Sequence, residues 1–198
     1  MKTLAIEREF GSGGREIGRR VAGKAGIPFY DGELLIKEAE RRGVSLDLLK
    51  EYDEKKTGSI LYNIALLANY GQDMKQDRIY EMCERLQDTI RDLAMQGPAV
   101  FIGRCSTEIL KGEKTVGAFL YCSDEKQRVA RVVRTEKVSE SEARKLMERR
   151  DRQRKDYFKF WAQKNWADRK NYDLELNTGT LSPEACEAIL LQAIGYEK

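Results

Sequence analysis

The chain of 198 residues contains no histidine, and its four cysteines are scattered without a Cys-x-x-Cys pair. These two absences argue against a zinc site and against a mechanism built on an imidazole base. The default interpretation of Cys83, Cys105, Cys122 and Cys186 is four buried, reduced thiols. The sequence also lacks a signal peptide and an apolar run long enough to span a membrane. We therefore expect a cytoplasmic protein.

The chain has 41% hydrophobic and 35% charged residues, a composition typical of globular proteins. Its length suits one domain over 1–198. The net charge of +3 is unevenly distributed. Residues 126–170 hold 16 basic and 7 acidic side chains, a net charge of +9, against −6 for the rest. This basic block is consistent with a solvated helical face, a nucleic-acid surface, or an arginine-rich flap that closes on nucleotide phosphates. Composition alone does not choose among the three.

Hydrophobic periodicity predicts short apolar strands that alternate with amphipathic helices. The expected strands cover residues 4–8, 29–30, 99–102, 115–121 and 172–176. The expected helices cover residues 14–25, 33–42, 46–52, 59–70, 78–95, 124–134, 139–154 and 183–194. Strands separated by helices imply an α/β fold of three layers, with about five parallel strands and helices on both faces. Functional residues should then gather at the carboxyl ends of the strands.

A glycine cluster, Gly11 to Gly14, separates the first strand from the first helix. This layout presents backbone N–H groups and a helix N-terminus to a phosphate. It approaches the P-loop pattern G-x-x-x-x-G-K-[ST], but Gly14-Arg15 takes the place of Gly-Lys, Glu9 replaces the first glycine, and Glu16 replaces the hydroxyl residue. The dinucleotide fingerprint G-x-G-x-x-G fits less well, because its third glycine also falls on Glu16. The alternative interpretation is a tight turn with no ligand.

Two more candidates follow the next strands. Asp31-Gly32 ends the second strand, and Gly103-Arg104 ends the third. Asp31 suits either a nucleotide contact or a cap on the following helix, and Arg104 suits either a substrate phosphate or a structural ion pair. Both positions are predicted to meet the glycine cluster at one edge of the sheet.

At these positions the chain resembles the cytidylate kinase-like family, a branch of the P-loop nucleoside monophosphate kinases. Residues 8–18, with the sequence Arg-Glu-Phe-Gly-Ser-Gly-Gly-Arg-Glu-Ile-Gly, are similar to the opening of that branch, and residues 26–31 are similar to its continuation. Gly103-Arg104-Cys105 resembles a Gly-Arg-Asp motif whose arginine contacts the monophosphate. Asp151 to Arg154 resembles the Asp-x-x-Arg of an arginine-rich lid, and residues 171–194 resemble the final strand and helix.

The chain departs from the family pattern at positions that carry chemistry. Arg15 replaces the loop lysine, and Glu16 and Ile17 replace the small and hydroxyl residues after it. The arginine that typically holds the acceptor phosphate falls on Ile36, with Lys37 beside it. The resemblance therefore implies the fold and nucleotide binding more directly than it implies catalysis.

The resemblance implies a kinase that transfers the γ-phosphoryl group of ATP to CMP or dCMP, with Mg²⁺ as cofactor. Phosphoryl transfer needs positioning and charge neutralisation more than a strong base, so the absence of histidine is no obstacle. The alternatives are a non-catalytic nucleotide-binding regulatory module and, less favoured, a nucleic-acid-binding protein. The expected partners are nucleotides, with no membrane and with self-association left open. A monophosphate-binding helical region is expected over about 31–96 and the lid over about 135–170.

Site residues are assigned on the same basis. The catalytic cations are Arg15, Arg128, Arg131, Arg150 and Arg154. The donor phosphates are assigned to Gly11, Ser12, Gly13, Gly14, Arg15 and Glu16, and the monophosphate to Asp31, Lys37, Gly103, Arg104 and Asp151.

Several of these residues have plain structural alternatives. Arg128 and Arg131 lie three residues apart on one helical face and suit a solvated surface, and Asp151 suits an ion pair with Lys155. No metal ligand is assigned, although Ser12 is a substitute hydroxyl and either Glu7 or Glu9 can act through water. The aromatic residues Phe158, Phe160, Trp161 and Trp166 suit either stacking on a base or packing of the lid.

Overall fold

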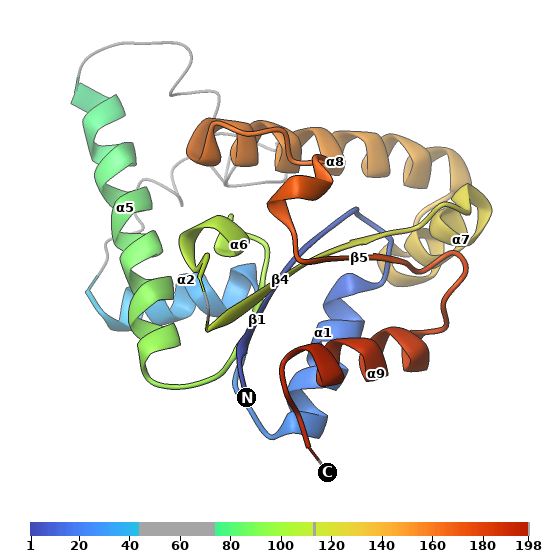
Figure 1. Ribbon diagram of the computed structural model, residues 1–198. Coiled ribbons are helices and arrows are strands. Elements are labelled where there is room, and N and C mark those ends of the chain that lie inside the picture. Colours follow the sequence, from blue (N-terminus) through green and yellow to red (C-terminus); the bar gives the residue numbers. More distant parts are fainter. Residues whose placement is uncertain (44–73, 113, 198) are drawn as a thin grey trace.

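The computed structural model describes residues 1–43, 74–112 and 114–197, so the helices expected at 46–52 and 59–70 lie outside the described residues. Five parallel strands form one sheet in the order β2-β3-β1-β4-β5 (Figure 1). The strands are β1 (Thr3–Arg8), β2 (Phe29–Tyr30), β3 (Val100–Ile102), β4 (Thr115–Tyr121) and β5 (Leu174–Asn177). The predicted α/β class and the parallel sheet are confirmed.

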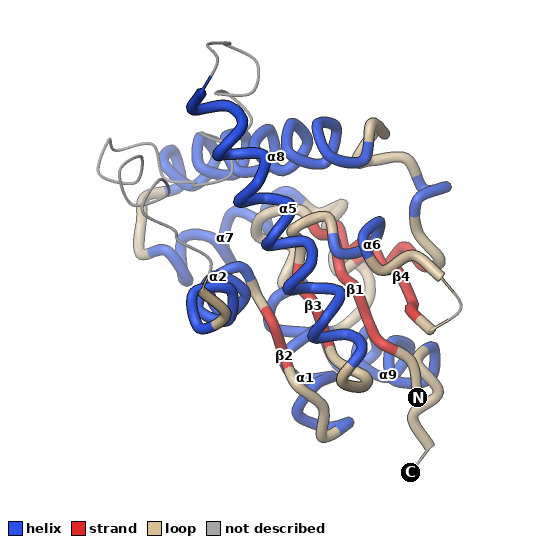
Figure 2. Tube along the Cα trace, turned by 90° about the vertical axis from the view of Figure 1, so that its left-hand side faces the viewer, coloured by secondary structure: helices blue, strands red, loops and turns tan. Residues whose placement is uncertain are grey.

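Helices cover both faces of the sheet (Figure 2). They are α1 (Gly14–Ala25), α2 (Gly32–Arg41), α5 (Met74–Met95), α6 (Ser106–Ile109), α7 (Glu125–Glu136), α8 (Glu140–Ala162) and α9 (Pro183–Ala193), with one 3₁₀ turn, η1 (Arg169–Asn171). Three of these helices begin at a side-chain cap: Asp124, Ser139 and Ser182 precede α7, α8 and α9, and each accepts a hydrogen bond from an amide of the first turn.

The alternation of side chains along β1 divides the core into two layers. Leu4 and Ile6 face α1 and α9, where they pack with Ile17 and Leu190. On the opposite face, Phe101 packs with residues of α2 and α5. Further along that face, Phe119 packs with the carboxyl-terminal part of α8 and the loop after it. The sheet therefore lies between two helical layers.

The long helix α8 crosses above the carboxyl ends of the strands (Figure 1). It packs against α7, and together they bring the basic block over the edge of the sheet where the site was predicted. Among the described helices, none combines the length and the apolar character that a membrane crossing requires.

Candidate nucleotide site

A cavity of about 710 Å³ opens at the carboxyl ends of β1, β2 and β3, beneath α8. Its walls come from the three loops that follow these strands and from one face each of α7 and α8. The three strand ends that the sequence singled out are therefore brought together, as parallel strand order requires. This size suits a small-molecule ligand.

The glycine loop forms the first wall. Gly11 and Gly13 have φ values of +81° and +86°, and Gly13 is the N-cap of α1 without any side-chain cap. Within the described part of the chain, the amides of Gly11, Gly13, Arg15 and Glu16 donate no hydrogen bond. Free amides at a helix N-terminus form a site that favours an anion. The geometry needed for phosphate binding is present.

Four side chains from distant segments hold this loop in shape. Arg128 Nε donates to Phe10 O (2.6 Å), and Arg131 Nη1 donates to Gly11 O (2.7 Å). Asp151 Oδ1 accepts from Phe10 N (2.7 Å), while Asp151 Oδ2 pairs with Arg128. On the other side, Thr178 Oγ1 donates to the carbonyl of Ser12 (2.7 Å). The loop conformation thus depends on α7, α8 and the segment after β5.

These contacts change the interpretation of two predicted site residues. Arg128 and Asp151 are absent from the cavity lining, because both side chains are turned toward the loop backbone. Asp151 pairs with Arg128 instead of with Lys155 in the described structure. Arg131 does line the cavity and lies against Gly13, so it is not a solvated surface residue.

Arg15 extends from the first turn of α1 toward Asp31, at the end of β2. Its Nε and Nη2 atoms lie 2.8 Å and 2.6 Å from Asp31 Oδ2. Asp31 Oδ1 also accepts from Leu34 N (3.1 Å), so this residue does cap the following helix, which was one of the two roles expected for it. Burial opposes ionisation of Asp31, but the Leu34 amide and Arg15 outweigh it and lower the pKa of that carboxyl. Arg15 is therefore already engaged with a carboxylate.

The turn after β3 forms the opposite wall. Gly103, Arg104 and Cys105 are three consecutive residues in the left-handed region, with φ values of +71°, +61° and +60°. Each non-glycine residue there costs about 1–3 kcal/mol, so the surrounding structure must impose the turn. The Cys105 amide donates to Glu7 Oε1 (3.1 Å), which fixes the turn from β1. As a result Arg104 lines the cavity, with Nη2 3.5 Å from the carbonyl of Gly32.

Glu7 is the buried carboxylate behind this turn, with 3% of its surface exposed. Its second oxygen accepts a hydrogen bond from Trp166 Nε1 (3.3 Å). Burial raises the pKa of Glu7, and the neighbouring Arg8 opposes that shift. Trp166 is itself buried and packs edge-on against Phe119 at 5.0 Å between ring centres. The packing alternative for Trp166 is thereby confirmed.

The helix α8 forms the roof of the cavity. Arg150, Arg154 and Tyr157 line it from above. Arg154 Nη1 donates to the carbonyl of Arg8 (2.8 Å), and its guanidinium lies 5.4 Å from the centre of the Phe10 ring. Burial lowers the pKa of Arg154 and raises that of Tyr157. Two of the predicted lid arginines thus face the cavity.

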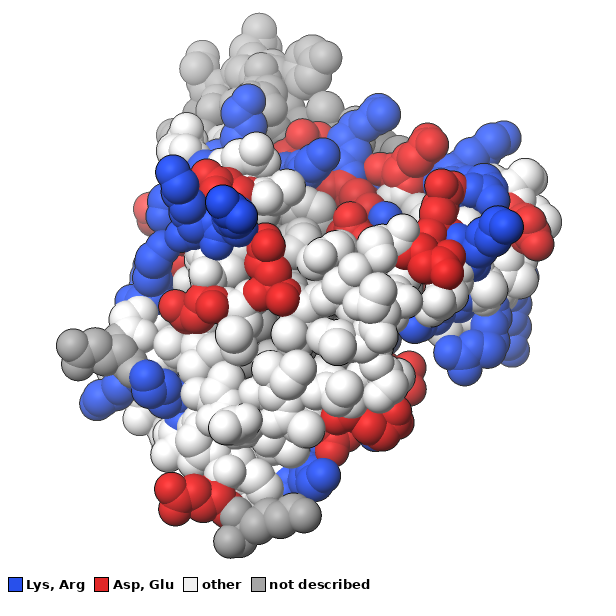
Figure 3. All heavy atoms as spheres, turned by 45° about the vertical axis from the view of Figure 1, so that its right-hand side comes forward, with Lys and Arg blue, Asp and Glu red and all other residues white. Residues whose placement is uncertain are grey.

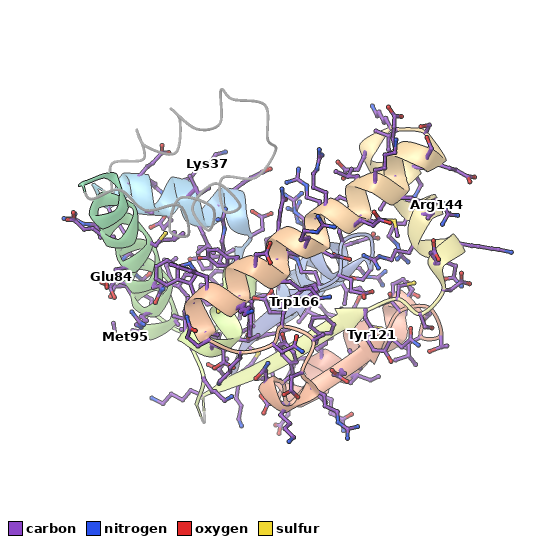
Figure 4. The ribbon with its side chains drawn as sticks, turned by 90° about the horizontal axis from the view of Figure 1, so that it is seen from above. Lys37, Glu84, Met95, Tyr121, Arg144 and Trp166 are labelled. Carbon is purple, nitrogen blue, oxygen red and sulfur yellow. The ribbon has the colours of Figure 1, made fainter. Side chains whose placement is uncertain are left out.

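Two other predicted residues lie elsewhere. Lys37 is exposed on α2 and absent from the lining, and Figure 4 labels it across the molecule from Arg144, near the start of α8. Ser12 is fully buried, and its hydroxyl lies 3.4 Å from Gly14 N.

Sequence reasoning missed Arg8 and Tyr157 as site residues. Arg8 could have been predicted, because it is the last residue of β1 and ligands bind at the carboxyl ends of parallel strands.

The described residues contain no group of three or more carboxylates, cysteines or histidines arranged to hold a metal ion. The nearby Glu9 is engaged, since its Oε2 accepts from Cys122 N (3.1 Å) and lies 3.3 Å from Arg128. Mg²⁺ in kinase sites is commonly held by substrate phosphates and water with few protein ligands. These residues fit a magnesium ion delivered with the nucleotide better than a metal bound by protein alone.

The distribution of charged side chains on the surface tests the alternative that the protein binds nucleic acid. On the face drawn in Figure 3, positive and negative side chains are interspersed around a broad uncharged area, without a continuous basic stripe. Part of the basic block is used internally, because Arg128 and Arg131 hold the glycine loop and Arg154 holds Arg8. The charge of residues 126–170 is therefore explained in part by the site.

Comparison with solved structures supports the fold. An uncharacterized protein from Eubacterium ventriosum ATCC 27560 is 26% identical with a TM-score of 0.72, and the match covers all of both chains. TT1252 from Thermus thermophilus is 19% identical with a TM-score of 0.53, covering 100% of this chain and 98% of that one. A shikimate kinase from Bacteroides thetaiotaomicron is 13% identical with a TM-score of 0.51, covering 98% of each chain. The chain thus shares its fold with these proteins, one of which is a shikimate kinase.

No curated protein matches the chain. The sequence does match the cytidylate kinase-like family over residues 3–180, which is most of its length and includes the glycine loop, the turn at Arg104 and α8. The chain belongs to the cytidylate kinase-like family.

Proposed function

We propose that the protein is a nucleoside monophosphate kinase that transfers the γ-phosphoryl group of ATP to CMP or dCMP. One observation carries the proposal: a loop of free amides at the start of α1 and a fixed arginine, Arg104, line the same cavity from two different strand ends. The first suits donor phosphates and the second suits the phosphate of an acceptor.

In this mechanism the amides of the glycine loop bind the donor phosphates. Arg104 binds the monophosphate of the acceptor, and Arg131, Arg150 and Arg154 neutralise charge on the transferring group. The γ-phosphorus forms a bond to an acceptor phosphate oxygen while its bond to the bridging oxygen of ATP breaks, and ADP leaves. Mg²⁺ supplies further charge neutralisation when it is bound with the nucleotide.

Arg15 has to change partner in this scheme. Its guanidinium is paired with Asp31, whereas the role of a loop lysine requires contact with the donor phosphates. A triphosphate carries more charge than one carboxylate and competes for the same fork of donors. We propose that nucleotide binding transfers Arg15 from Asp31 to the phosphates. Asp31 Oδ2 then keeps Arg19 Nη2 at 3.6 Å and can accept a hydrogen bond from the acceptor.

The same ion pair favours a second candidate, a non-catalytic nucleotide-binding module. If Arg15 remains on Asp31, the loop binds phosphate through its amides alone and lacks the cation that drives transfer. This candidate predicts nucleotide binding without turnover.

An ADP-release assay separates the two candidates. ATP and Mg²⁺ are incubated in turn with CMP, dCMP, UMP, AMP and GMP, and the release of ADP is followed through a coupled enzyme. The kinase proposal predicts turnover that depends on the acceptor and is highest with CMP or dCMP. An enzyme inactive on all five that still binds ATP would support the module instead.

A further inference from the structure

Several arginines of the cavity lining have no carboxylate partner within the described part of the chain, and one of them, Arg131, already holds the glycine loop through Gly11 O. Arg8, Arg104 and Arg154 line the cavity, and none lies within 4.0 Å of an acidic oxygen there. Arg15 and Arg128, by contrast, are paired with Asp31 and Asp151. Three neighbouring cations at one site repel one another, and partial burial adds to the unfavourable energy.

Some of this positive charge is balanced locally. Glu7 lies next to Arg8, but its two oxygens already accept from Cys105 N and Trp166 Nε1. Arg154 and Arg104 each donate to one backbone carbonyl. Arg8 makes no side-chain hydrogen bond among the described residues. Most donors of Arg8 therefore remain available to a ligand.

The side chain of Arg8 spans the gap between the two walls of the site. Its stem lies beside the start of α1, where a Cβ added to Gly14 would stand 2.9 Å from Arg8 Cβ and 3.1 Å from Cγ. Its guanidinium lies against the turn after β3, where a Cβ added to Gly103 would overlap Nη1 and stand 3.1 Å from Cζ. Arg8 thus runs from the glycine loop to the residue before Arg104.

We propose that Arg8 is a catalytic residue that binds the transferring phosphoryl group at the boundary between the donor and acceptor subsites. This rests on the proposed function. The group in transit carries negative charge on three equatorial oxygens. The planar fork of Arg8 donates to these oxygens from the side of β1, while Arg104 holds the acceptor and Arg154 closes from α8. Arg8 thus supplies a second cation at the boundary of the two subsites, beside the one that Arg15 brings to the donor phosphates.

The test compares Arg8→Gln and Arg8→Lys with a matched control, Arg134→Gln. Arg134 is an exposed arginine of α7 outside the cavity lining, so the control removes one positive charge without touching the site. Circular dichroism melting first establishes that each variant folds, and steady-state assays then separate kcat from KM. Arg8→Gln should lower kcat about 100-fold or more, because a donor aimed at transition-state charge is lost. Arg8→Lys should recover about a tenth of the activity, since charge remains but the fork does not.

The possible outcomes separate a failure of the role proposed for Arg8 from a failure of the proposed kinase function. An active wild type whose Arg8→Gln variant keeps kcat within about threefold would overturn the role of Arg8 and leave the proposed function standing. If Arg8→Gln does not fold, Arg8→Lys is used instead, and a kcat within about threefold of the wild type overturns the role of Arg8. If the wild type is inactive on every acceptor, the test becomes the affinity of the wild type and of Arg8→Gln for tripolyphosphate, measured by titration calorimetry. A tenfold weaker affinity in Arg8→Gln supports Arg8 as a phosphate ligand, and equal affinities overturn it.

Discussion

The loops after β1 and β3 line the same cavity but are built in opposite ways. The glycine loop exposes backbone amides and is held from outside by Arg128, Arg131 and Asp151. The turn at Gly103 to Cys105 exposes a side chain and is held from inside by Glu7. Backbone amides at a helix N-terminus favour an anionic group whatever molecule carries it. An arginine on a strained, fixed turn suits one particular phosphate position.

The difference implies that donor and acceptor binding can be disrupted separately. Changes in the glycine loop or its supports should affect ATP, whereas changes at the turn should affect the monophosphate. Arg8 and Arg15 connect the two regions, because Arg8 reaches Gly103 and Arg15 reaches Asp31. Their loss should therefore affect transfer more than the binding of either substrate.

The largest effect is expected at Arg15. If this residue neutralises charge during transfer, Arg15→Ala should lower kcat about 100-fold or more, while KM for ATP moves less than about threefold. Arg15→Lys should keep part of the activity because the charge survives. Steady-state kinetics with varied ATP measure both values. A variant that loses ATP affinity alone, with kcat intact, would contradict this role and favour the module.

The turn should show the opposite pattern. Arg104→Ala should weaken monophosphate binding by about 1.5–3 kcal/mol, the range of hydrogen bonds to charged groups. ATP affinity should stay nearly constant, since the amides proposed to bind it lie on the other wall. Titration calorimetry with CMP and with ATP measures each affinity. Equal losses for both nucleotides would mean that the two walls are not separate subsites.

Backbone geometry offers a third way to separate the regions. Gly103→Ala should destabilise the fold by about 1–3 kcal/mol, because the position has φ +71° and an added Cβ overlaps Arg8. Gly11→Ala should behave similarly, since φ is +81° and the Cβ would lie 2.6 Å from Val132 Cγ2. Urea unfolding measures both. The first variant should raise KM for the monophosphate and the second should raise KM for ATP.

Gly23 provides the control for these substitutions. It lies within α1, and a Cβ added there meets no atom within 4 Å. Gly23→Ala should stabilise the helix by about 0.5–1 kcal/mol. If Gly103→Ala were equally harmless, the left-handed turn would not be a constraint on the site.

The smallest expected effect is a pH dependence from Glu7. Its pKa is raised in the folded protein, so its contribution to stability is full below the unfolded pKa and is lost as pH rises through the folded value. The free energy of unfolding of the wild type, minus that of Glu7→Gln, should therefore fall as the pH rises above the ordinary glutamate pKa of 4.5. Each unit of raised pKa corresponds to about 1.4 kcal/mol. A difference that stays constant or grows with pH would contradict the assignment.

Local signals were sufficient for most of the fold. The bounds of α1, β2 and β4 match the predicted ranges, because glycines, prolines and alternating apolar residues mark those ends. The short helix α6 was not predicted, since it has only four residues and follows a left-handed turn that no propensity indicates. The last strand begins at Leu174, two residues later than predicted, because η1 and its cap at Tyr172 occupy the preceding positions.

The site was predictable where it depends on strand ends and was not where it depends on distant partners. Gly11, Arg104 and Asp31 were expected to lie together and do line one cavity, because parallel strands bring their loops to the same edge. The bond from Phe10 N to Asp151 and the link between Glu7 and Trp166 join residues more than 140 positions apart. Sequence spacing carries no signal for such contacts. Arg8 was overlooked because the P-loop pattern directs attention to the residue after the last glycine.

The central claim is that this cavity moves a phosphoryl group between two nucleotides. The most direct measurement uses ATP radiolabelled at the γ-phosphorus, incubated with Mg²⁺ and CMP, followed by chromatographic separation of the products. The account predicts label in CDP, and loss of that label in Arg104→Ala at low CMP. Label found only in inorganic phosphate, or retained entirely in ATP with every monophosphate tried, would contradict it.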